Sequence, residues 1–296
     1  MALADVDIDA SLVRRLLTTQ FPQWADLSLE PVPSAGTDNA LYRLGDDMVV
    51  RLPRKTWAIG QADKEHRWLP LLAPHLPLAV PEPLGKGDPG EGYPWTWSVH
   101  RWLDGEDATV RSPDDLRRAA ADLAAFVGAL QEVDVTHGPP SGEHNVHRGV
   151  PLAARDPLTR VAIDELDGLL DARAVTAAWE SALGAPVWDG PPRWIHGDLQ
   201  SGNLLVREGR LSAVIDFGLL GVGDPACDLM IAWTFLGKEE RASFRAALAV
   251  DDATWERGRG WTVSVGVSQL AAYLEANPVL SGIARRGIDE VLADRS

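Results

Sequence analysis

The stretch HGDLQSGN at residues 196–203, together with LSAVIDFG at residues 211–218, carries most of the information about what this chain is. Both stretches place polar residues beside short apolar runs such as RWI, NLLV and LSAVI. Short apolar runs that end at polar loops are typical of strands. We therefore expect Asp198, Asn203 and Asp216 at the ends of adjacent strands, within reach of one metal ion or one substrate.

These three side chains suit the transfer of a phosphoryl group. Carboxylate and amide oxygens are hard ligands of the kind that magnesium prefers in proteins. A further carboxylate beside the metal can orient a hydroxyl group and accept its proton during attack. The sequence thus predicts a magnesium-dependent reaction at a hydroxyl group.

Composition limits the partners of the protein. The chain has 296 residues, enough for two lobes or one large domain. It carries 28 basic and 43 acidic side chains, a formal net charge of -15. This charge disfavours nucleic acid or an anionic membrane as a partner and admits a cationic small molecule, although acidity that merely maintains solubility is an equal alternative.

Targeting and thiol signals are absent from the sequence. The chain opens with acidic residues instead of a basic segment and an apolar run, and no apolar stretch reaches the roughly 18 residues of a membrane helix. We therefore expect a cytoplasmic protein. The single cysteine, Cys227, excludes an internal disulfide and a zinc site made of several thiolates. The sequence gives no indication of the oligomeric state.

The first hundred residues alternate between helical and strand patterns. A helix is expected to begin at a cap formed by Asp9 or Ser11, and a later helix is expected to be kinked or shortened by Pro70. The expected elements are a helix at 11–20, a hairpin at 41–54, a helix at 60–76 and strands at 80–87 and 93–103.

Helical spacing dominates the rest of the chain. The strongest helical pattern, at 112–133, begins with Ser112 as an apparent cap and Pro113 at the first helical position. Further helices are expected at 158–170, at 172–183 and after residue 218. The expected fold class is α+β with two lobes: a small, β-rich amino-terminal lobe at 1–101 and a larger, mainly helical carboxy-terminal lobe at 102–296.

The segment WIHGDLQSGNLLV at 194–206 and the segment LSAVIDFGLLGVGDPACDLMIAW at 211–233 resemble the aminoglycoside phosphotransferase family of small-molecule kinases. These are relatives of the protein kinases that carry HGD where protein kinases carry HRD, and macrolide phosphotransferases are close to them. The resemblance extends over nearly the whole chain. It implies a protein-kinase-like fold and transfer of the γ-phosphoryl group of ATP or GTP to a hydroxyl group.

The resemblance also implies roles for the residues of the two quoted stretches. Asp198 is similar to the catalytic base that accepts the proton of the substrate hydroxyl. Asn203 and Asp216 correspond to magnesium ligands, and His196 to a residue that organises the catalytic loop. A second pair of acids, Asp224 and Asp228, matches a segment that supports the site, with helix capping as the alternative explanation.

In the amino-terminal lobe the resemblance implies a nucleotide site. Gly36 and Asn39 belong to the loop that would cover the phosphates, although an ordinary hairpin loop has the same composition. Arg51 stands where kinases usually have lysine, and Glu65 stands at the acid that pairs with it. Arginine can pair with both phosphate and carboxylate. Lys55 is the second candidate for the phosphate contact.

The segment WSVHRWLDGED at 97–107 resembles the hinge between kinase lobes. Backbone groups of His100, Arg101 and Trp102 are expected to bind the purine. Trp95 precedes this segment, Trp97 and Trp102 lie within it, and all three are candidates for lining a pocket. The remaining tryptophans with helical apolar neighbours are expected in the core: Trp68, Trp179, Trp233 and Trp261.

The acceptor stays open at this stage. The resemblance favours an aminoglycoside, while a macrolide or a metabolic amino alcohol or sugar is the alternative. A metal-dependent phosphohydrolase would use the same acids but gives no role to Arg51 and Glu65. A nucleotide-binding module without turnover is a third possibility. The loop with His144 and His147 beside Glu143 reads as a solvated loop or a metal cluster, and the resemblance also gives it a part in acceptor binding.

Overall fold

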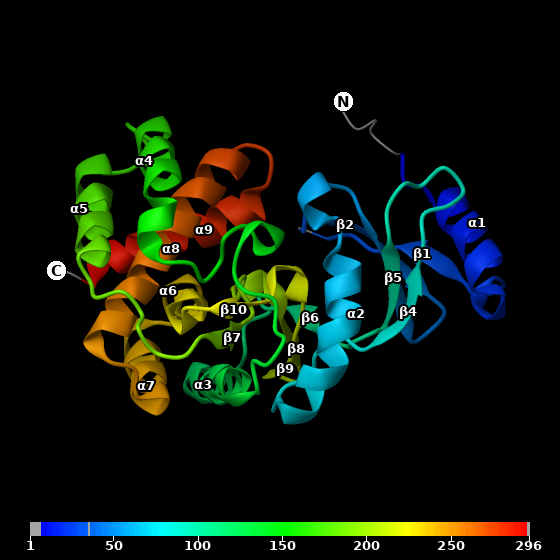
Figure 1. Cartoon of the computed structure of the whole chain (residues 1–296), viewed down its shortest axis with the longest axis horizontal. Coiled ribbons are helices and arrows are strands. Elements are labelled where there is room, and N and C mark those ends of the chain that lie inside the picture. The colour runs from blue at the N-terminus through cyan, green and yellow to red at the C-terminus, as the bar shows by residue number, and fades with distance from the viewer. Residues whose placement is uncertain (1–6, 35, 295–296) are drawn as a thin grey trace. The chain divides into compact units, whose positions relative to one another are not determined.

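The computed structural model describes residues 7–34 and 36–294. The acidic start of the chain, on which the expectation of no leader segment rests, lies largely outside these residues. The chain divides into two compact units, Met1–Pro74 with Ala79–Asp104 and His75–Leu78 with Gly105–Ser296. After the last strand of the sheet, the chain passes from the first unit to the second between Asp104 and Gly105. This boundary lies three residues later than the 101/102 boundary expected from the sequence. Figure 1 shows the elements of both units.

The first unit is built on a five-stranded sheet with the strand order β1-β2-β3-β5-β4. All neighbouring strands pair antiparallel. One helix, α1, lies on one side of this sheet and another, α2, on the opposite side (Figure 1). The elements are α1 (Ala10–Gln20), β1 (Leu29–Pro31), β2 (Asn39–Leu44), β3 (Met48–Pro53), α2 (Gln61–Leu72), β4 (Pro83–Gly87) and β5 (Trp97–Arg101).

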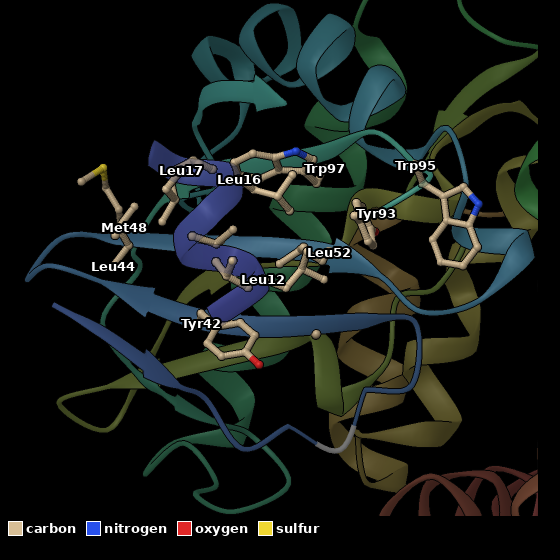
Figure 2. Close-up of a cluster of buried hydrophobic side chains, with 14 residues drawn as sticks. Leu12, Leu16, Leu17, Tyr42, Leu44, Met48, Leu52, Tyr93, Trp95 and Trp97 are labelled. Atoms are coloured by element: carbon tan, nitrogen blue, oxygen red, sulfur yellow. The ribbon is translucent and has the colours of Figure 1, made fainter. Parts of the chain in front are cut away.

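The core of the first unit forms where α1 meets the sheet. Leucines of α1 point toward alternate residues of β2, β3 and β5, as Figure 2 shows. Alternation places every second residue of a strand on the same face, so the hairpin buries one face here and leaves the other for α2. The cluster includes Trp95 and Trp97, of which Trp97 is fully buried. These two tryptophans are core residues, and the expectation that they line a pocket is wrong.

The local expectations for this unit hold in most places. Asp9 caps α1 by accepting a hydrogen bond from the backbone N–H of Leu12 at 2.7 Å. The hairpin turns at Gly45, which has φ of 59°. Pro70 lies inside α2, which continues only to Leu72 and is followed by a short 3₁₀ segment. The proline therefore shortens the helix relative to the pattern.

The second unit is mainly helical. The long, largely buried α8 packs against α4, α5 and α9, and α3 packs against α7 (Figure 1). The elements are β6 (Glu106–Asp107), α3 (Leu116–Glu132), α4 (Asp156–Glu165), α5 (Ala172–Leu183), β7 (Arg193–Ile195), β8 (Leu204–Arg207), β9 (Arg210–Val214), β10 (Gly221–Gly223), α6 (Ile231–Thr234), α7 (Lys238–Leu248), α8 (Asp252–Tyr273) and α9 (Pro278–Ala293). The four tryptophans expected in the core, Trp68, Trp179, Trp233 and Trp261, are all buried.

The start of α3 differs from its expected start. The helix begins at Leu116 with Asp115 as its cap, whose carboxylate accepts from the N–H of Arg118 at 3.1 Å. The N–H of Asp114 instead donates to the carbonyl of Gly209 at 2.9 Å. This contact with the β8–β9 turn holds the preceding residues outside the helix. The expectation that Ser112 caps the helix is therefore wrong by three residues.

Two small sheets lie within the second unit. One pairs β7 with β10, and the other has the order β6-β8-β9. The strand before Asp198 is therefore not in the sheet of Asn203 and Asp216, contrary to the expectation of adjacent strands. Within the described part of the chain, none of the helices is both long and apolar enough to cross a membrane.

Candidate active site

Asn203 and Asp216 are brought together by the hairpin of β8 and β9. Asn203 immediately precedes β8, Leu204 pairs with Val214 at the end of β9, and the N–H of Ile215 donates to the carbonyl of Asn203 at 2.9 Å. Asp216 follows in a left-handed conformation with φ of 64°, which aspartate tolerates better than most residues. The amide and the carboxylate thus leave the same end of one hairpin.

Asp198 is tied to this hairpin through the amide of Asn203. The Nδ2 of Asn203 donates to the backbone carbonyl of Asp198 at 2.7 Å and to its Oδ2 at 3.1 Å. Gln200 donates its Nε2 to the same Oδ2 at 2.9 Å. Because the nitrogen of the Asn203 amide is engaged in this way, its Oδ1 is the atom left to ligate a cation. The structure therefore brings Asp198 and Asn203 into direct contact.

His196 links the backbone of Asp198 to the residue before Asp216. Its Nδ1 accepts a hydrogen bond from the N–H of Asp198 at 3.2 Å, so the proton of the neutral ring sits on Nε2. Nε2 then donates to the carbonyl of Ile215 at 3.0 Å. The ring is buried and lies against Phe217, with 4.5 Å between ring centroids. His196 thus connects the segments of Asp198 and Asp216.

Gly197 has a steric reason to be glycine. Its φ is 83°, and a Cβ at this position would lie 2.4 Å from the carbonyl oxygen of Leu219. A larger residue would therefore strain the backbone and clash at the same time. This geometry accounts for HGD, rather than HRD, in this loop.

Asp228 holds the backbone of the two residues that precede Asp198. Its two carboxylate oxygens accept the N–H groups of His196 at 2.7 Å and Gly197 at 2.8 Å. Asp228 is fully buried, and burial raises its pKa, while the two N–H bonds act in the opposite direction. Burial also raises the pKa of the neighbouring thiol of Cys227.

Asp224 has different partners from Asp228. It caps the 3₁₀ helix Pro225–Met230 by accepting from the N–H of Ala226 at 3.0 Å. It also forms a buried ion pair with Arg257, with Oδ2 2.7 Å from Nε. Helix capping, the alternative explanation from the sequence, therefore describes Asp224, and its carboxylate pairs with Arg257.

Two further side chains contact Asp198 and were not singled out from the sequence. Gln200 lies in the same loop, so its polar character there was the available signal. Arg148 places Nη2 at 3.6 Å from Oδ1 of Asp198, from a loop far away in the sequence. Nothing in the spacing of the chain points to that second contact.

The residues present fit magnesium. Among residues 7–34 and 36–294, no three His, Cys, Asp or Glu side chains are grouped closely enough to hold a metal by themselves. Asn203 and Asp216 offer an amide and a carboxylate oxygen, and magnesium in nucleotide sites takes one or two such protein ligands, with phosphates and water completing its shell. The donor set therefore suits a magnesium–nucleotide complex.

Arg51 and Glu65 form a buried ion pair in the first unit. Nη1 of Arg51, on β3, lies 2.9 Å from both carboxylate oxygens of Glu65, on α2. Their side chains are 11% and 2% exposed, so the pair is shielded from screening by solvent. The structure thus places Arg51 and Glu65 together. The exposed Lys55 instead lies 5.8 Å from the ring of Trp57.

The loop that was expected to cover the phosphates is described only in part, because residue 35 lies outside the described residues. Gly36 donates its N–H to the hydroxyl of Ser34 at 3.0 Å. Asn39 is the first residue of β2 and lies opposite Pro53 of β3. The two residues therefore belong to the approach and the start of the β2–β3 hairpin.

The proposed hinge is more strongly engaged than expected. The N–H of Arg101 donates to the carbonyl of Glu82 at 2.9 Å, and that of Trp102 donates to the carbonyl of Asp47 at 2.7 Å. The guanidinium of Arg43 lies over the ring of Trp102 at 4.0 Å. A purine edge at this segment would need a donor other than these two N–H groups.

His100 lies on the Arg51 side of the sheet and is 1% exposed. Within the described residues, neither of its ring nitrogens has a hydrogen-bond partner. Burial lowers its pKa well below 6.5, and the charges of Arg51 and His66 act in the same direction. His100 is therefore neutral in the folded protein near neutral pH.

The neutral state of His100 predicts a pH dependence of stability. Below the unfolded-state pKa of 6.5, the unfolded chain binds a proton that the folded chain does not, so the free energy of unfolding falls as pH falls. We expect His100→Leu to reduce this fall by up to about 1.4 kcal/mol per pH unit. Urea unfolding of both proteins at pH 7.5 and pH 5 measures the difference, and parallel losses would contradict it.

The chain belongs to the phosphotransferase enzyme family (APH), whose sequence profile matches residues 29–261. The family and the two-part α+β fold expected from the sequence are both confirmed. The chain is a phosphotransferase that acts on hydroxyl groups.

Two curated proteins are similar to the chain over part of their length. The uncharacterized protein YcbJ of Bacillus subtilis (strain 168) is 24% identical over 212 residues, which are 67% of this chain and 66% of that protein. An aminoglycoside 3'-phosphotransferase of Escherichia coli is 27% identical over 210 residues, 68% of this chain and 74% of that protein. The alignment thus spans about two thirds to three quarters of these relatives.

Solved structures are similar over nearly the whole chain. The GDP and kanamycin complex of APH(2")-IIia has a TM-score of 0.73 and 25% identity, covering 96% of this chain and 98% of that one. The macrolide 2'-phosphotransferase MphH of Brachybacterium faecium has a TM-score of 0.60 and 24% identity, covering 93% and 98%. This second similarity concerns the fold alone.

Proposed function

We propose that this phosphotransferase transfers the γ-phosphoryl group of ATP or GTP to a hydroxyl group of an aminoglycoside. The contact that carries the proposal is the amide of Asn203, which bonds to the backbone carbonyl and the Oδ2 of Asp198. The nitrogen of this amide thereby holds the proposed catalytic base, while its oxygen is the proposed magnesium ligand. The name of the similar Escherichia coli protein and the kanamycin in the similar structure support the acceptor.

Asp198 would align the acceptor hydroxyl and accept its proton. Two amide donors, from Gln200 and Asn203, already hold Oδ2, so one oxygen of the carboxylate is in place before substrate binds. A preoriented acceptor of the proton lowers the barrier because little reorganisation remains to be done in the transition state. Bound magnesium would neutralise charge on the phosphate oxygens.

The nucleotide role of residues 1–101 and the acceptor role of residues 102–296 are also part of the proposal. Arg51, fixed by Glu65, would bind the phosphates. The loop with Gly36 and Asn39 would cover them, and the segment His100–Trp102 would lie at the purine. We also propose a cytoplasmic location, because ATP and GTP are available there.

The acceptor class rests on charge as well as similarity. A net charge of -15 attracts polycations and disfavours nucleic acid. A macrolide is the second candidate because a macrolide 2'-phosphotransferase has the same fold. A metabolic amino alcohol or sugar is the third, and no contact in the structure favours it.

The test is phosphate transfer by the purified protein. Radiolabelled ATP or GTP, with magnesium, is offered with aminoglycosides, macrolides and small amino alcohols, and phosphorylated product is detected by mass spectrometry. Product from aminoglycosides alone would support the proposal. Product from a macrolide alone would replace the acceptor, and hydrolysis that no acceptor stimulates would favour a phosphohydrolase.

The substitution Asp216→Ala tests whether Asp216 is one of the two proposed magnesium ligands. Removal of this carboxylate leaves Asn203 as the remaining protein ligand, so we expect the magnesium concentration for half-maximal turnover to rise at least about 10-fold. Titration of turnover and of nucleotide binding with magnesium chloride measures this change. An unchanged magnesium requirement would exclude Asp216 as a ligand.

A further inference from the structure

Arg148 is a buried cation with an unusual set of partners. It is 7% exposed, and its Nη2 lies 3.6 Å from Oδ1 of Asp198. Among the described residues, Asp198 provides the one carboxylate that pairs with it. Its Nε and Nη1 are buried and have no hydrogen-bond partner there. Burying a charge with two unsatisfied donors is costly, so the position calls for an explanation beyond packing.

The loop that carries Arg148 is strained. Val146 has φ of 53° and His147 has φ of 56°, both in the left-handed region. This region is unfavourable for a side chain and most unfavourable for a β-branched one such as valine. Such conformations persist only where the surroundings impose them, and they gather at functional sites.

Neighbouring contacts impose this conformation. Asn145 is fully buried, accepts from the N–H of Gly142 at 3.0 Å and donates to the carbonyl of Arg148 at 3.0 Å. Arg155 donates from Nη1 to the carbonyl of Val146 at 3.1 Å. The loop is thus fixed on both sides of the residue that enters the site.

Gly149 lets the loop come close to β7, the strand that precedes Asp198 in the chain. Its φ is 78°, and a Cβ there would lie 2.5 Å from Cδ1 of Ile195, the last residue of β7. Its carbonyl accepts the N–H of Asp224 at 2.8 Å. The backbone next to Arg148 is therefore packed against the end of β7 and hydrogen-bonded to the residue that follows β10.

We infer that Arg148 is a positioning residue for the catalytic carboxylate of Asp198. Oδ2 is held by the amides of Gln200 and Asn203, whereas Oδ1 faces the guanidinium of Arg148. Contacts at both oxygens fix the rotation of the carboxylate, which contacts at one oxygen leave free. The inference rests on the proposed function, in which Asp198 accepts the proton of the acceptor.

The kinetic test compares Arg148→Met, Arg148→Lys and Arg241→Met. Methionine removes the charge and keeps a similar side-chain volume, and lysine restores the charge without the planar fork. Arg241 is a matched control, because it is a buried arginine that pairs with Glu290 and Asp294 near α9. We expect Arg148→Met to lower kcat by about 10- to 100-fold, with KM for nucleotide and acceptor nearly unchanged. Arg148→Lys should recover part of the lost kcat. Arg241→Met should lower stability only.

A second measurement is independent of any acceptor. Urea unfolding midpoints are compared for Arg148→Met, Asp198→Asn and the double variant. With Arg148 present, Asp198→Asn leaves the guanidinium without its carboxylate and lowers the midpoint. In the Arg148→Met background, the same change is expected to lower the midpoint less, because no buried guanidinium is left unpaired.

The two measurements separate the possible failures. A kcat within twofold of wild type in Arg148→Met, no recovery with lysine, or additive midpoints would overturn the inference. Absence of turnover in the wild type with every acceptor, together with non-additive midpoints, would count against the proposed function while supporting the contact between Arg148 and Asp198.

Discussion

Asp198→Asn is expected to lower kcat by roughly 10³-fold while nucleotide binding stays near its wild-type value. Asparagine keeps the shape of the side chain but cannot accept the acceptor proton as a carboxylate does. Gln200 and Asn203 both donate to Oδ2 of Asp198, and the amide oxygen of asparagine can accept the same two bonds, so its NH2 group takes the place of Oδ1. Steady-state turnover and calorimetric titration with the nucleotide measure the two effects separately.

A matched control is available in the same unit. Asp171 caps α5 by accepting from the N–H of Ala174 at 3.0 Å, and asparagine is an equally good cap. Asp171→Asn should therefore change neither turnover nor stability. If Asp198→Asn retained more than a tenth of wild-type kcat, Asp198 would not be the base, and the proposed mechanism would have to be abandoned.

Local sequence patterns predicted the relation between Asn203 and Asp216 correctly. These residues flank two strands joined by a tight turn, so a hairpin that brings its two ends together follows from alternation and turn position. The exact partner of Leu204 does not, because a register shift between Leu205 and Val206 places it opposite Val214. The relation of Asp198 to them could not be obtained in this way, because β7 belongs to a different sheet. The contact is made instead by side chains, which a strand pattern does not describe.

Errors in the sequence interpretation arise where long-range packing overrides a local signal. Ser112 and Pro113 have the residue types of a helix start, yet the contact of Asp114 with Gly209 delays the helix to Leu116. Trp97 is the first residue of the proposed hinge segment, but the alternation of side chains along β5 places it in the hydrophobic core.

The Arg51–Glu65 pair was predicted from family resemblance, since a strand residue and a helix residue show no mutual signal in composition. For Arg148 the resemblance pointed only to the loop that contains it, as a part of acceptor binding, and gave no signal for a contact with Asp198. Its contact with Asp198 depends on a loop whose conformation is imposed by Asn145 and Arg155. Contacts of this type become visible only in three dimensions.

Asp228→Ala is expected to reduce both stability and activity. The carboxylate is the acceptor for the buried N–H groups of His196 and Gly197, and alanine leaves both without it. Loss of two such bonds costs about 2–5 kcal/mol in the free energy of unfolding. Because the loop that holds Asp198 loses its support, kcat per folded molecule should also fall by about 10²-fold. Urea unfolding and turnover corrected for the folded fraction measure the two effects.

The variant Asp224→Ala is the control that separates a loss of general stability from a loss of support for residues 196–198. Asp224 is a buried aspartate of the same segment, but its ion pair is with Arg257 and it makes no hydrogen bond to residues 196–198 among the contacts described. It should therefore lower stability by a similar amount, since it leaves a buried guanidinium unpaired, with a much smaller loss of kcat per folded molecule. Equal losses of kcat in the two variants would mean that Asp228 acts through general stability, and the specific support of the catalytic loop would be refuted.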